Sequence, residues 1–293
     1  ISGYFCDLPS NDFPESIPYL GQPKEVVTYL QQHHIEQVYC CLPSARSHEI
    51  VPIINYCENH LIRFYSVPNI RNYLHRRMHF GNIPVLTIRE EPLTQMENRL
   101  LKRAFDLFFS LSFLCTVFPF VYIIIGTTIK LSSSGPIFFK QKRSGENGNE
   151  FWCYKFRSMR VNIDSDELQA TANDPRKTKI GDFIRKTSID ELPQFINVLL
   201  GQMSVVGPRP HMLKHTEEYS RLIDKYMVRH LVKPGITGWA QVTGYRGETK
   251  ELWQMEGRVQ RDVWYLEHWT FLLDLYIIYK TVRNAVRGEK EAY

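Results

Sequence analysis

The sequence predicts an α/β protein in two parts. A small Rossmann-like domain with a parallel sheet is expected over residues 1–92, and a mainly helical, monotopic domain over residues 97–293, with a re-entrant membrane helix at residues 104–130. Helical and strand-like patterns alternate to about residue 90, a charge-free apolar run follows, and the remainder is basic and aromatic. The 293 residues, 43% hydrophobic and 23% charged, are enough for two folded domains.

The N-terminal part alternates between helical and strand-like patterns. We expect helix, strand, helix, strand and strand in that order, over residues 25–35, 36–43, 48–60, 61–68 and 83–88. This alternation predicts parallel strands flanked by helices. Because the part contains no G-x-G-x-x-G fingerprint, we expect a scaffold or regulatory role in place of nucleotide binding. The chain opens at Ile1 as if partway through a strand, so we expect the natural protein to extend further upstream.

Net charge and cysteine content limit the kinds of partner and the cellular environment that we expect. The formal net charge of +5 suits an anionic membrane surface or a phosphorylated substrate, and we expect no nucleic-acid partner. The six cysteines form no C-x-x-C and no regular ladder of spacings. This argues against a disulfide framework or a zinc site and favours a reducing, cytoplasmic environment.

The apolar run Leu107–Ile129 has no charged residue, and as a straight helix it would reach roughly 34 Å, enough to cross a bilayer. Pro119 near its middle removes one backbone hydrogen bond and bends the helix. Both flanks are basic, through Arg99, Lys102 and Arg103 on one side and Lys130, Lys140, Lys142 and Arg143 on the other. Positive charge at both ends favours a helix that enters and leaves by the cytoplasmic face.

That re-entrant helix would free carbonyl groups at its break. They would need a nearby partner, for which Ser110, Ser112 and Thr116 are the candidates. A plain membrane span and a buried helix of a soluble protein remain open as alternatives.

Two further stretches each allow two interpretations, one of which is contact with a membrane. Lys155, Arg157 and Arg160 fall at spacings that let some of them share a face, either as a cationic pocket for phosphates or as attraction to anionic headgroups. The aromatic, amphipathic residues 251–288 suit either a headgroup boundary or an ordinary core helix.

The stretch Arg185–Pro210 carries the strongest chemical signal. Apolar residues at helical spacing predict a helix that begins near Asp190, with Asp190 as N-cap and Pro193 in the first turn. Alternatively, Ser188 and Glu191 form a capping box. Either way, the acids could simply start an ordinary helix.

Three features point beyond a helix cap. A carboxylate at a helix N-terminus beside Arg185 and Lys186 stays ionised and therefore nucleophilic. Free amides at the same place can receive a phosphate. Pro208 and Pro210 restrict the backbone around Arg209, which favours a fixed guanidinium for phosphate or pyrophosphate. Together these features suggest phosphoryl transfer through an aspartyl-phosphate type intermediate on Asp190, with Mg²⁺ held by Asp190 and Glu191.

At this point the sequence resembles a known family, the bacterial polyprenyl-phosphate hexose-1-phosphate transferases. The matching segments span nearly all of residues 99–285 and are KRAFD, GPIFFKQKRSG, KFRSM, DPRKTKIG, RKTSIDELPQFINVLLGQMSVVGPRP, KPGITGWAQV and DVWYLEHWT. The resemblance implies a ping-pong reaction at the cytoplasmic face of the bacterial inner membrane. Asp190 would attack the β-phosphate of a UDP-sugar and release UMP, and undecaprenyl phosphate would then take the phosphosugar.

The resemblance also implies roles for single residues. Glu191 would complete the catalytic dyad and bind magnesium, while Lys155, Arg185 and Asp262 match positions around the family's active site. Arg209, with Pro208 and Pro210, matches the loop that holds the nucleotide in the family. Arg157, from the cationic stretch described above, and Arg246, in the segment Thr243–Thr249, are the other candidates for binding substrate. Pro119 matches the family's break in the re-entrant helix.

The long members of this family carry a regulatory module between four transmembrane helices and the catalytic part, and the N-terminal domain resembles it. The resemblance therefore implies missing upstream helices and a homodimer. The segment Thr243–Thr249 resembles the R-G-E-T segment of the glucose-1-phosphate subgroup, so UDP-glucose is the expected substrate. Departures at Thr243 and His268, where asparagine is common, and at Asp182, where a basic residue is frequent, leave glucose versus galactose or a UDP-N-acetylated sugar open.

Two hypotheses from other classes are weaker. A nucleotide-sugar dehydratase or dehydrogenase would need a glycine-rich dinucleotide fingerprint, which the sequence lacks. A non-catalytic membrane scaffold would explain the apolar run but not the acids and arginines of residues 185–210.

Overall fold

The structure is a computed structural model that describes residues 2–9, 14, 16–67, 78–80, 83–87, 91–160, 176–247, 249 and 251–287. It divides into two compact units, Ile1–Glu90 and Glu91–Tyr293. The positions and segments singled out above include seven residues that lie outside the described residues, namely Ile1, Pro68, Ile88, Asp174, Pro175, Glu248 and Gly288.

The N-terminal unit builds a four-stranded sheet in the order β3-β4-β6-β5 beside the small parallel pair β1-β2. Its elements are β1 (Tyr4–Phe5), β2 (Tyr19–Gly21), α1 (Val26–Gln32), β3 (Gln37–Cys40), α2 (Ser47–Asn59), β4 (Arg63–Ser66), β5 (Met78–Phe80) and β6 (Ile83–Thr87). The helices bury apolar side chains such as Leu30, Ile53 and Cys57 against Cys40 and Phe64 of the sheet.

The prediction of a parallel sheet holds for only part of this unit. Strands β3 and β4 are parallel, as the helix α2 between them requires, but β6 runs antiparallel to both β4 and β5. Two residues separate β5 from β6, which is the length of a hairpin. A parallel neighbour would need a crossover of a dozen or more residues.

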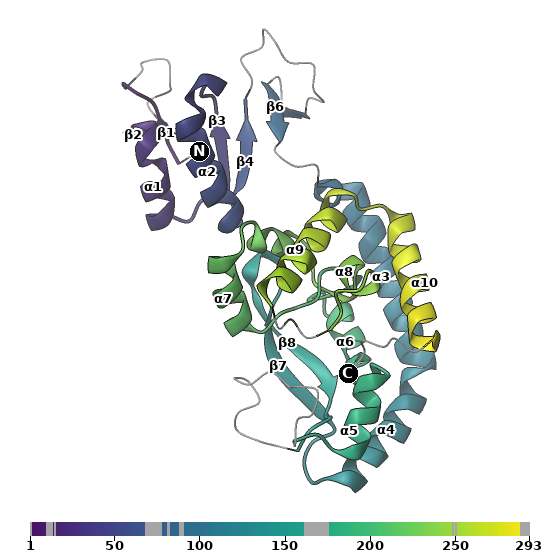
Figure 1. Ribbon diagram of the computed structural model, residues 1–293. Coiled ribbons are helices and arrows are strands. Elements are labelled where there is room, and N and C mark those ends of the chain that lie inside the picture. Colours follow the sequence, from purple (N-terminus) through teal and green to yellow (C-terminus); the bar gives the residue numbers. More distant parts are fainter. Residues whose placement is uncertain are drawn as a thin grey trace. The chain divides into compact units, whose positions relative to one another are not determined.

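The C-terminal unit begins with two long helices, α3 (Met96–Thr116) and α4 (Phe118–Ser132), that form a bent rod along its side (Figure 1). No described helix is long and apolar enough to cross a membrane alone, whereas α3 and α4 pass that test as a pair bent by 56°. Pro119 stands in the first turn of α4, so the bend falls where the proline was expected to break the helix. The re-entrant form itself stays a prediction.

Of the hydroxyl groups expected to bond carbonyl groups near this bend, that of Thr116 makes a hydrogen bond, whereas that of Ser110 makes none within the described part of the chain. The Thr116 hydroxyl donates to the Ser112 carbonyl at 2.7 Å, in the turn before the break. The buried Ser110 hydroxyl has no hydrogen-bond partner among the described residues.

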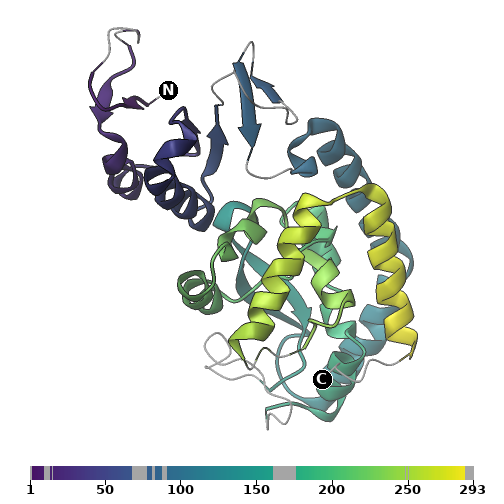
Figure 2. The same ribbon diagram turned by 45° about the horizontal axis from the view of Figure 1, so that its top comes forward.

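The rest of the unit packs around two short parallel strands, β9 and β10. Its elements are the antiparallel hairpin β7 (Phe138–Ser144) and β8 (Glu150–Phe156), then α5 (Lys179–Lys186), α6 (Gln194–Leu199), β9 (Ser204–Val206), α7 (Leu213–Leu222), a 3₁₀ helix (Tyr226–Leu231), β10 (Gly235–Thr237), α8 (Trp239–Val242), α9 (Leu252–Glu267) and α10 (Phe271–Arg287). Helices α9 and α10 follow one another as a hairpin, with α10 beside α3 (Figures 1 and 2).

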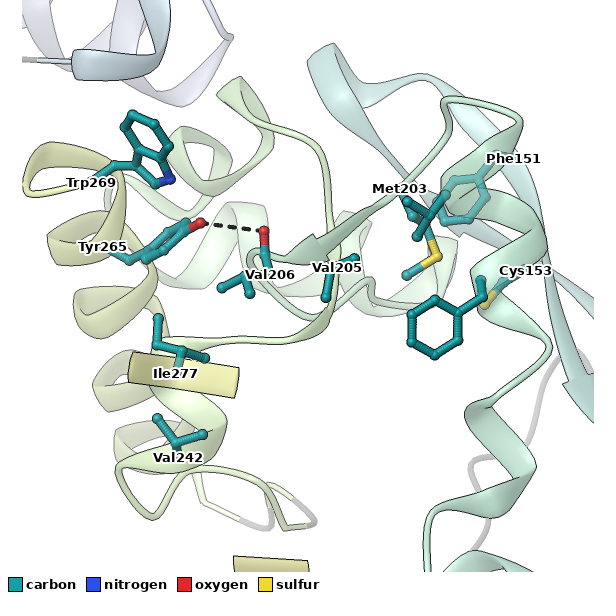
Figure 3. Packing of buried hydrophobic residues seen from close by; sticks show 11 residues of the cluster. Phe151, Cys153, Met203, Val205, Val206, Val242, Tyr265, Trp269 and Ile277 are labelled. Carbon is teal, nitrogen blue, oxygen red and sulfur yellow. Dashed lines mark hydrogen bonds between the residues drawn. The ribbon is translucent and has the colours of Figure 1, made fainter. Parts of the chain in front are cut away.

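The main core surrounds β9. Val205 and Val206 lie between Met203 and the hairpin side chains Phe151 and Cys153 on one side, and α9–α10 side chains on the other (Figure 3). Figure 3 also shows the Tyr265 hydroxyl donating to the Val206 carbonyl at 3.3 Å. Because β9 is fixed by this core, the Pro-Arg-Pro loop that follows it leaves from a rigid base.

Candidate active site

The two acids lie on a short 3₁₀ turn, Ile189–Glu191, that precedes α6. We call Ser188–Leu192 the reactive turn. A helical turn does begin beside Asp190, as expected, but it is 3₁₀, and the α-helix starts only at Gln194. Neither expected cap forms: Asp190 is not the N-cap of α6, and Ser188 makes no side-chain capping bond. Pro193 explains the difference, because it has no N–H to continue the hydrogen-bond ladder, and α6 starts anew after it.

The apolar residues of the reactive turn anchor it to the hydrophobic core. Ile189 and Leu192 pack into a cluster with Ile129 of α4, Phe156 of β8 and Ile184 of α5. Residues three apart share a side of a 3₁₀ turn, so the two acids between them face elsewhere.

Glu191 is fixed by two cations. Arg209 donates to both of its carboxylate oxygens, at 2.6 and 3.0 Å, and Lys155 Nζ lies 2.8 Å from Oε1. Burial raises the pKa of Glu191, but the attraction of Arg209 and Lys155 outweighs burial and holds the pKa well below its usual range. Glu191 is therefore a permanent anion that orients a guanidinium and an ammonium group.

Asp190 is placed differently. Its side chain is buried, yet its carboxylate accepts no hydrogen bond from the part of the chain that the structure describes. Burial raises its pKa to about 6, with Glu191 adding to the rise and Lys155, Arg185 and Arg209 opposing it. Near pH 7 the group is mostly ionised and its oxygens are not committed to a partner, which is the state that a nucleophile requires.

The three other predicted arginines, one catalytic (Arg185) and two substrate-binding (Arg157 and Arg246), divide into two groups. Arg246 donates to the Ser188 hydroxyl and Arg185 influences Asp190 electrostatically, so both lie at the reactive turn. Arg157 does not join them. Its guanidinium donates to the Ser133 and Ser134 carbonyls at the end of α4, at 2.8 Å for Ser133, so it ties the apolar helix pair to β8.

The Pro-Arg-Pro loop, Pro208–Pro210, is fastened through its backbone. Gly235 donates to the Pro208 carbonyl at 2.8 Å, and Arg229 donates to the Arg209 carbonyl at 2.7 Å. Gly207 before the loop must be glycine, because a Cβ there would lie 2.5 Å from the Lys233 carbonyl. These contacts fix the backbone from which the Arg209 side chain reaches Glu191.

Asp262 makes its contact behind this loop and not at the reactive turn. Its Oδ2 lies 2.8 Å from Arg229 Nη2, in an ion pair whose side chains are 1% and 2% exposed. Burial raises the pKa of Asp262 against the pull of Arg229 and Arg258. Asp262 therefore supports Arg209 indirectly, through Arg229, which local sequence patterns gave no reason to select.

The KRAFD segment provides a second support that was not foreseen. Lys102 of α3 pairs with Asp274 at 2.6 Å and donates to the Val206 carbonyl, while Asp106 accepts from Ser204 and from the Val205 amide. Arg103 donates to the Val198 and Leu199 carbonyls at the end of α6. The charged residues of this segment thus hold both elements that flank the site, α6 and β9.

A buried asparagine fixes Lys155. Asn197 of α6 accepts from the Tyr154 amide at 2.9 Å and donates to the Trp152 carbonyl at 2.7 Å. These bonds tie α6 to β8 one residue from Lys155. The helix that follows the acids and the strand that carries the lysine are therefore kept in register.

A magnesium ion would find carboxylate oxygens here but not a complete set of ligands. No group of three or more potential protein ligands lies together among the described residues. Glu191 already engages both oxygens with cations, whereas those of Asp190 are open. The residues fit an ion that takes one or two carboxylates and fills its other positions with water and substrate phosphate, as Mg²⁺ usually does with nucleotides.

Comparison with known proteins decides the family. Residues 97–288 match the model of the bacterial sugar transferase family. The chain belongs to the bacterial sugar transferase family. Residues 1–68 match a second family model, described as a CoA-binding domain. The family that the motifs predicted is thereby confirmed.

Several relatives carry functional names. The chain is 41% identical over 302 residues to a UDP-glucose:undecaprenyl-phosphate glucose-1-phosphate transferase of Xanthomonas campestris pv. campestris, covering 99% of this chain and 62% of the relative. It is 42% identical to a protein of the same name from Escherichia coli (strain K12), over 90% of this chain and 57% of the relative. A UDP-N-acetylgalactosamine-undecaprenyl-phosphate N-acetylgalactosaminephosphotransferase of Aeromonas hydrophila is 43% identical over 55% of this chain and 38% of its own length. The chain thus spans about three fifths of the first two relatives.

Proposed function

We propose that the protein transfers a hexose-1-phosphate, first of all glucose-1-phosphate, from a UDP-sugar to undecaprenyl phosphate, giving undecaprenyl-diphosphate-sugar and UMP. One observation carries this proposal: the buried carboxylate of Asp190, which accepts no hydrogen bond from the described residues, lies beside Glu191, an acid that is fixed by two cations. The names of the relatives support the sugar and the acceptor.

In the proposed first step, an oxygen of Asp190 attacks the β-phosphorus of the UDP-sugar. The bond from that phosphorus to the bridging oxygen breaks, and UMP leaves with the bonding electrons. The phosphosugar remains on Asp190 as an acyl phosphate. In the second step, a phosphate oxygen of undecaprenyl phosphate attacks the same phosphorus, and the carboxylate of Asp190 is released.

The surrounding cations serve this chemistry by their position. Arg209 and Lys155 are held by Glu191, so both stand ready beside the phosphorus without reorganising during the reaction. Arg185 adds positive charge at the same carboxylate. A bound magnesium ion, held by Asp190 or Glu191 together with the diphosphate, would supply further neutralisation of the leaving phosphate.

We further propose that the enzyme works at the cytoplasmic face of a bacterial inner membrane, in contact with membrane lipid, in the first membrane step of exopolysaccharide, capsule or O-antigen synthesis. The bent pair α3–α4 supports this location, since its exposed apolar side chains include Phe108, Phe120, Ile123 and Ile124. A homodimer is proposed as well, from the resemblance of the N-terminal domain to the regulatory module of long family members.

The sugar has an alternative. UDP-galactose or a UDP-N-acetylated sugar would undergo the same reaction, and the relative named for N-acetylgalactosamine supports keeping this second candidate. Thr243, which departs from the asparagine common in the family, lies in the segment on which the glucose assignment rests.

Release of UMP tests the proposal. Purified protein in lipid nanodiscs is incubated with UDP-glucose, UDP-galactose or a UDP-N-acetylhexosamine, with and without undecaprenyl phosphate and magnesium. We expect UMP from UDP-glucose, with turnover only when undecaprenyl phosphate is present. If no UDP-sugar yields UMP, the proposed function is wrong, and a preference for another sugar would replace glucose alone.

A further inference from the structure

The segment Thr243–Gly247 is docked on α9 through an aromatic ring. Tyr245 lies so close to the backbone of α9 that a Cβ added at Gly257 would be 2.4 Å from its Cε1 atom and 2.8 Å from its Cζ atom. Real Cβ atoms do not approach other atoms so closely, so the ring takes this place only because residue 257 is glycine. A glycine inside a helix costs stability relative to alanine, about 1 kcal/mol, which calls for a compensating role.

Two arginines of α9 complete the contact. The Arg261 guanidinium stacks over the Tyr245 ring, 3.9 Å from its centroid. The buried Arg258 donates from Nε to the Tyr245 carbonyl at 2.9 Å and from Nη2 to the Gly247 carbonyl at 2.7 Å. We call Tyr245, Gly257, Arg258 and Arg261 the tyrosine seat. It fixes the backbone on both sides of Arg246.

Arg246 itself reaches the reactive turn. Its Nη2 atom donates to the hydroxyl of Ser188, the residue that begins that turn in a left-handed conformation with a φ of 57°. Two residues further on stands Asp190. The tyrosine seat and the reactive turn come from distant parts of the sequence, and Arg246 is the side chain that joins them.

We propose that Tyr245 is a positioning residue: seated on Gly257, it places the Arg246 guanidinium beside the sugar phosphate at Asp190, and so strengthens the binding of the UDP-sugar. This inference rests on the proposed function. Arg246 makes the contact with substrate, and the tyrosine seat acts only through it.

A purely structural role for the tyrosine seat predicts a different result from a role that acts through Arg246. If Tyr245 only filled space against α9, its loss would lower stability, and it would affect activity independently of Arg246. If the seat acts through Arg246, a variant that disturbs it has no further effect once Arg246 is gone. Non-additivity of the two changes therefore separates the two roles.

The test compares Gly257→Ala, Arg246→Ala, their combination, Tyr245→Phe and Tyr245→Ala in nanodiscs, by UMP release over a range of UDP-glucose concentrations. The control is Gln260→Ala, an exposed position on the same helix. We expect Gly257→Ala, Tyr245→Ala and Arg246→Ala each to raise KM by roughly tenfold or more, with a smaller change in kcat, because a hydrogen bond from a charged group is lost or misplaced. Tyr245→Phe keeps the ring and is expected to match the wild type, as is Gln260→Ala.

The double variant separates the two roles. We expect Gly257→Ala/Arg246→Ala to have the KM of Arg246→Ala alone. The melting temperature of Gly257→Ala is expected to fall by a few degrees, because the added Cβ displaces the Tyr245 ring, so all variants are assayed well below it. Multiplying KM effects, or a Gly257→Ala enzyme with wild-type KM, would overturn the inference while leaving the proposed function intact. A wild-type protein that releases no UMP would overturn the proposed function, and this inference with it.

Discussion

The ion pair between Arg229 and Asp262 gives a prediction that separates stability from activity. Both side chains are at most 2% exposed, and within the described part of the chain the other charged neighbour of Asp262 is a second buried arginine, Arg258. Burial lowers the pKa of His211 and of His230, the latter to about 3, so neither histidine supplies a charge near neutral pH. Asp262→Asn therefore leaves two arginines buried without an acid beside them.

The expected cost is that of breaking a buried pair by removing one partner, about 3–5 kcal/mol of the free energy of unfolding. For a domain of this size, each kcal/mol shifts the melting temperature by roughly 2–4 °C. The Asp262→Asn protein should thus melt about 6–20 °C below the wild type. The control is Glu217→Gln, which breaks the exposed i,i+4 pair with Arg221 and should cost under about 1 kcal/mol.

A second variant tests what the pair is for. Arg229→Met with Asp262→Leu replaces the pair by apolar side chains, which is often neutral or stabilising. The melting temperature should therefore recover a large part of the loss seen in Asp262→Asn, but not all of it, because Arg258 stays buried without an acid beside it. Methionine cannot donate to the Arg209 carbonyl, so kcat/KM for UMP release should remain reduced by about tenfold. Full activity in this double variant would refute the idea that Arg229 positions Arg209.

Three further predictions follow from the site. Because the pKa of Asp190 is raised to about 6 and the ionised form is the nucleophile, UMP release should fall tenfold per pH unit below about pH 6. Lys155→Met removes a cation that lowers this pKa, so the acid limb of the pH profile should move to higher pH. An acid limb that does not move would contradict the assignment of Asp190. Arg209→Lys, which cannot contact both oxygens of Glu191, should lower kcat/KM by at least tenfold with little change in melting temperature, and equal activity would show that one contact suffices. Cysteines placed at Met96 and at Ser133, at the outer ends of α3 and α4, should both react with an impermeant thiol reagent from the cytoplasmic side, and labelling of either from the periplasm would exclude the re-entrant form.

The local parts of this site could be predicted from sequence because they are local. Asp190 and Glu191 are adjacent in the sequence. Proline on both sides of Arg209, fewer than twenty residues after Glu191, predicts that the Arg209 side chain leaves from a restricted backbone. Lys155 was selected by its match to the family, and β8 brings it to Glu191. The family assignment was correct for the same reason, since its motifs are short and specific.

The supports of the site could not be predicted, because they join residues far apart in the sequence. Arg229 sits in an apolar stretch that looks like any short helix, and only its contacts with Arg209 and Asp262 reveal its role. Lys102 meets Asp274 across 172 positions. Arg157 was placed at the substrate by charge and spacing, which do not reveal that carbonyl groups at the end of α4 take its guanidinium.

Two predictions differ from the structure, one about where a helix starts and one about the direction of a strand. Helical spacing correctly indicated a helix after the acids, but periodicity does not mark where hydrogen bonding restarts, and Pro193 moves that start to Gln194. In the N-terminal unit, the alternation of helices and strands predicted parallel neighbours. The hairpin formed by β5 and β6 turns the last strand antiparallel.

The most direct test of the central claim is to trap the phosphosugar on the enzyme. Wild-type protein is mixed with UDP-glucose in the absence of undecaprenyl phosphate, quenched in acid, and examined by intact-protein and peptide mass spectrometry. The predicted result is one added phosphohexose per chain, on the peptide containing Asp190, that disappears when undecaprenyl phosphate is supplied and never forms in Asp190→Asn. An adduct on another residue, or turnover by Asp190→Asn at the wild-type rate, would contradict the assignment of Asp190 as the nucleophile.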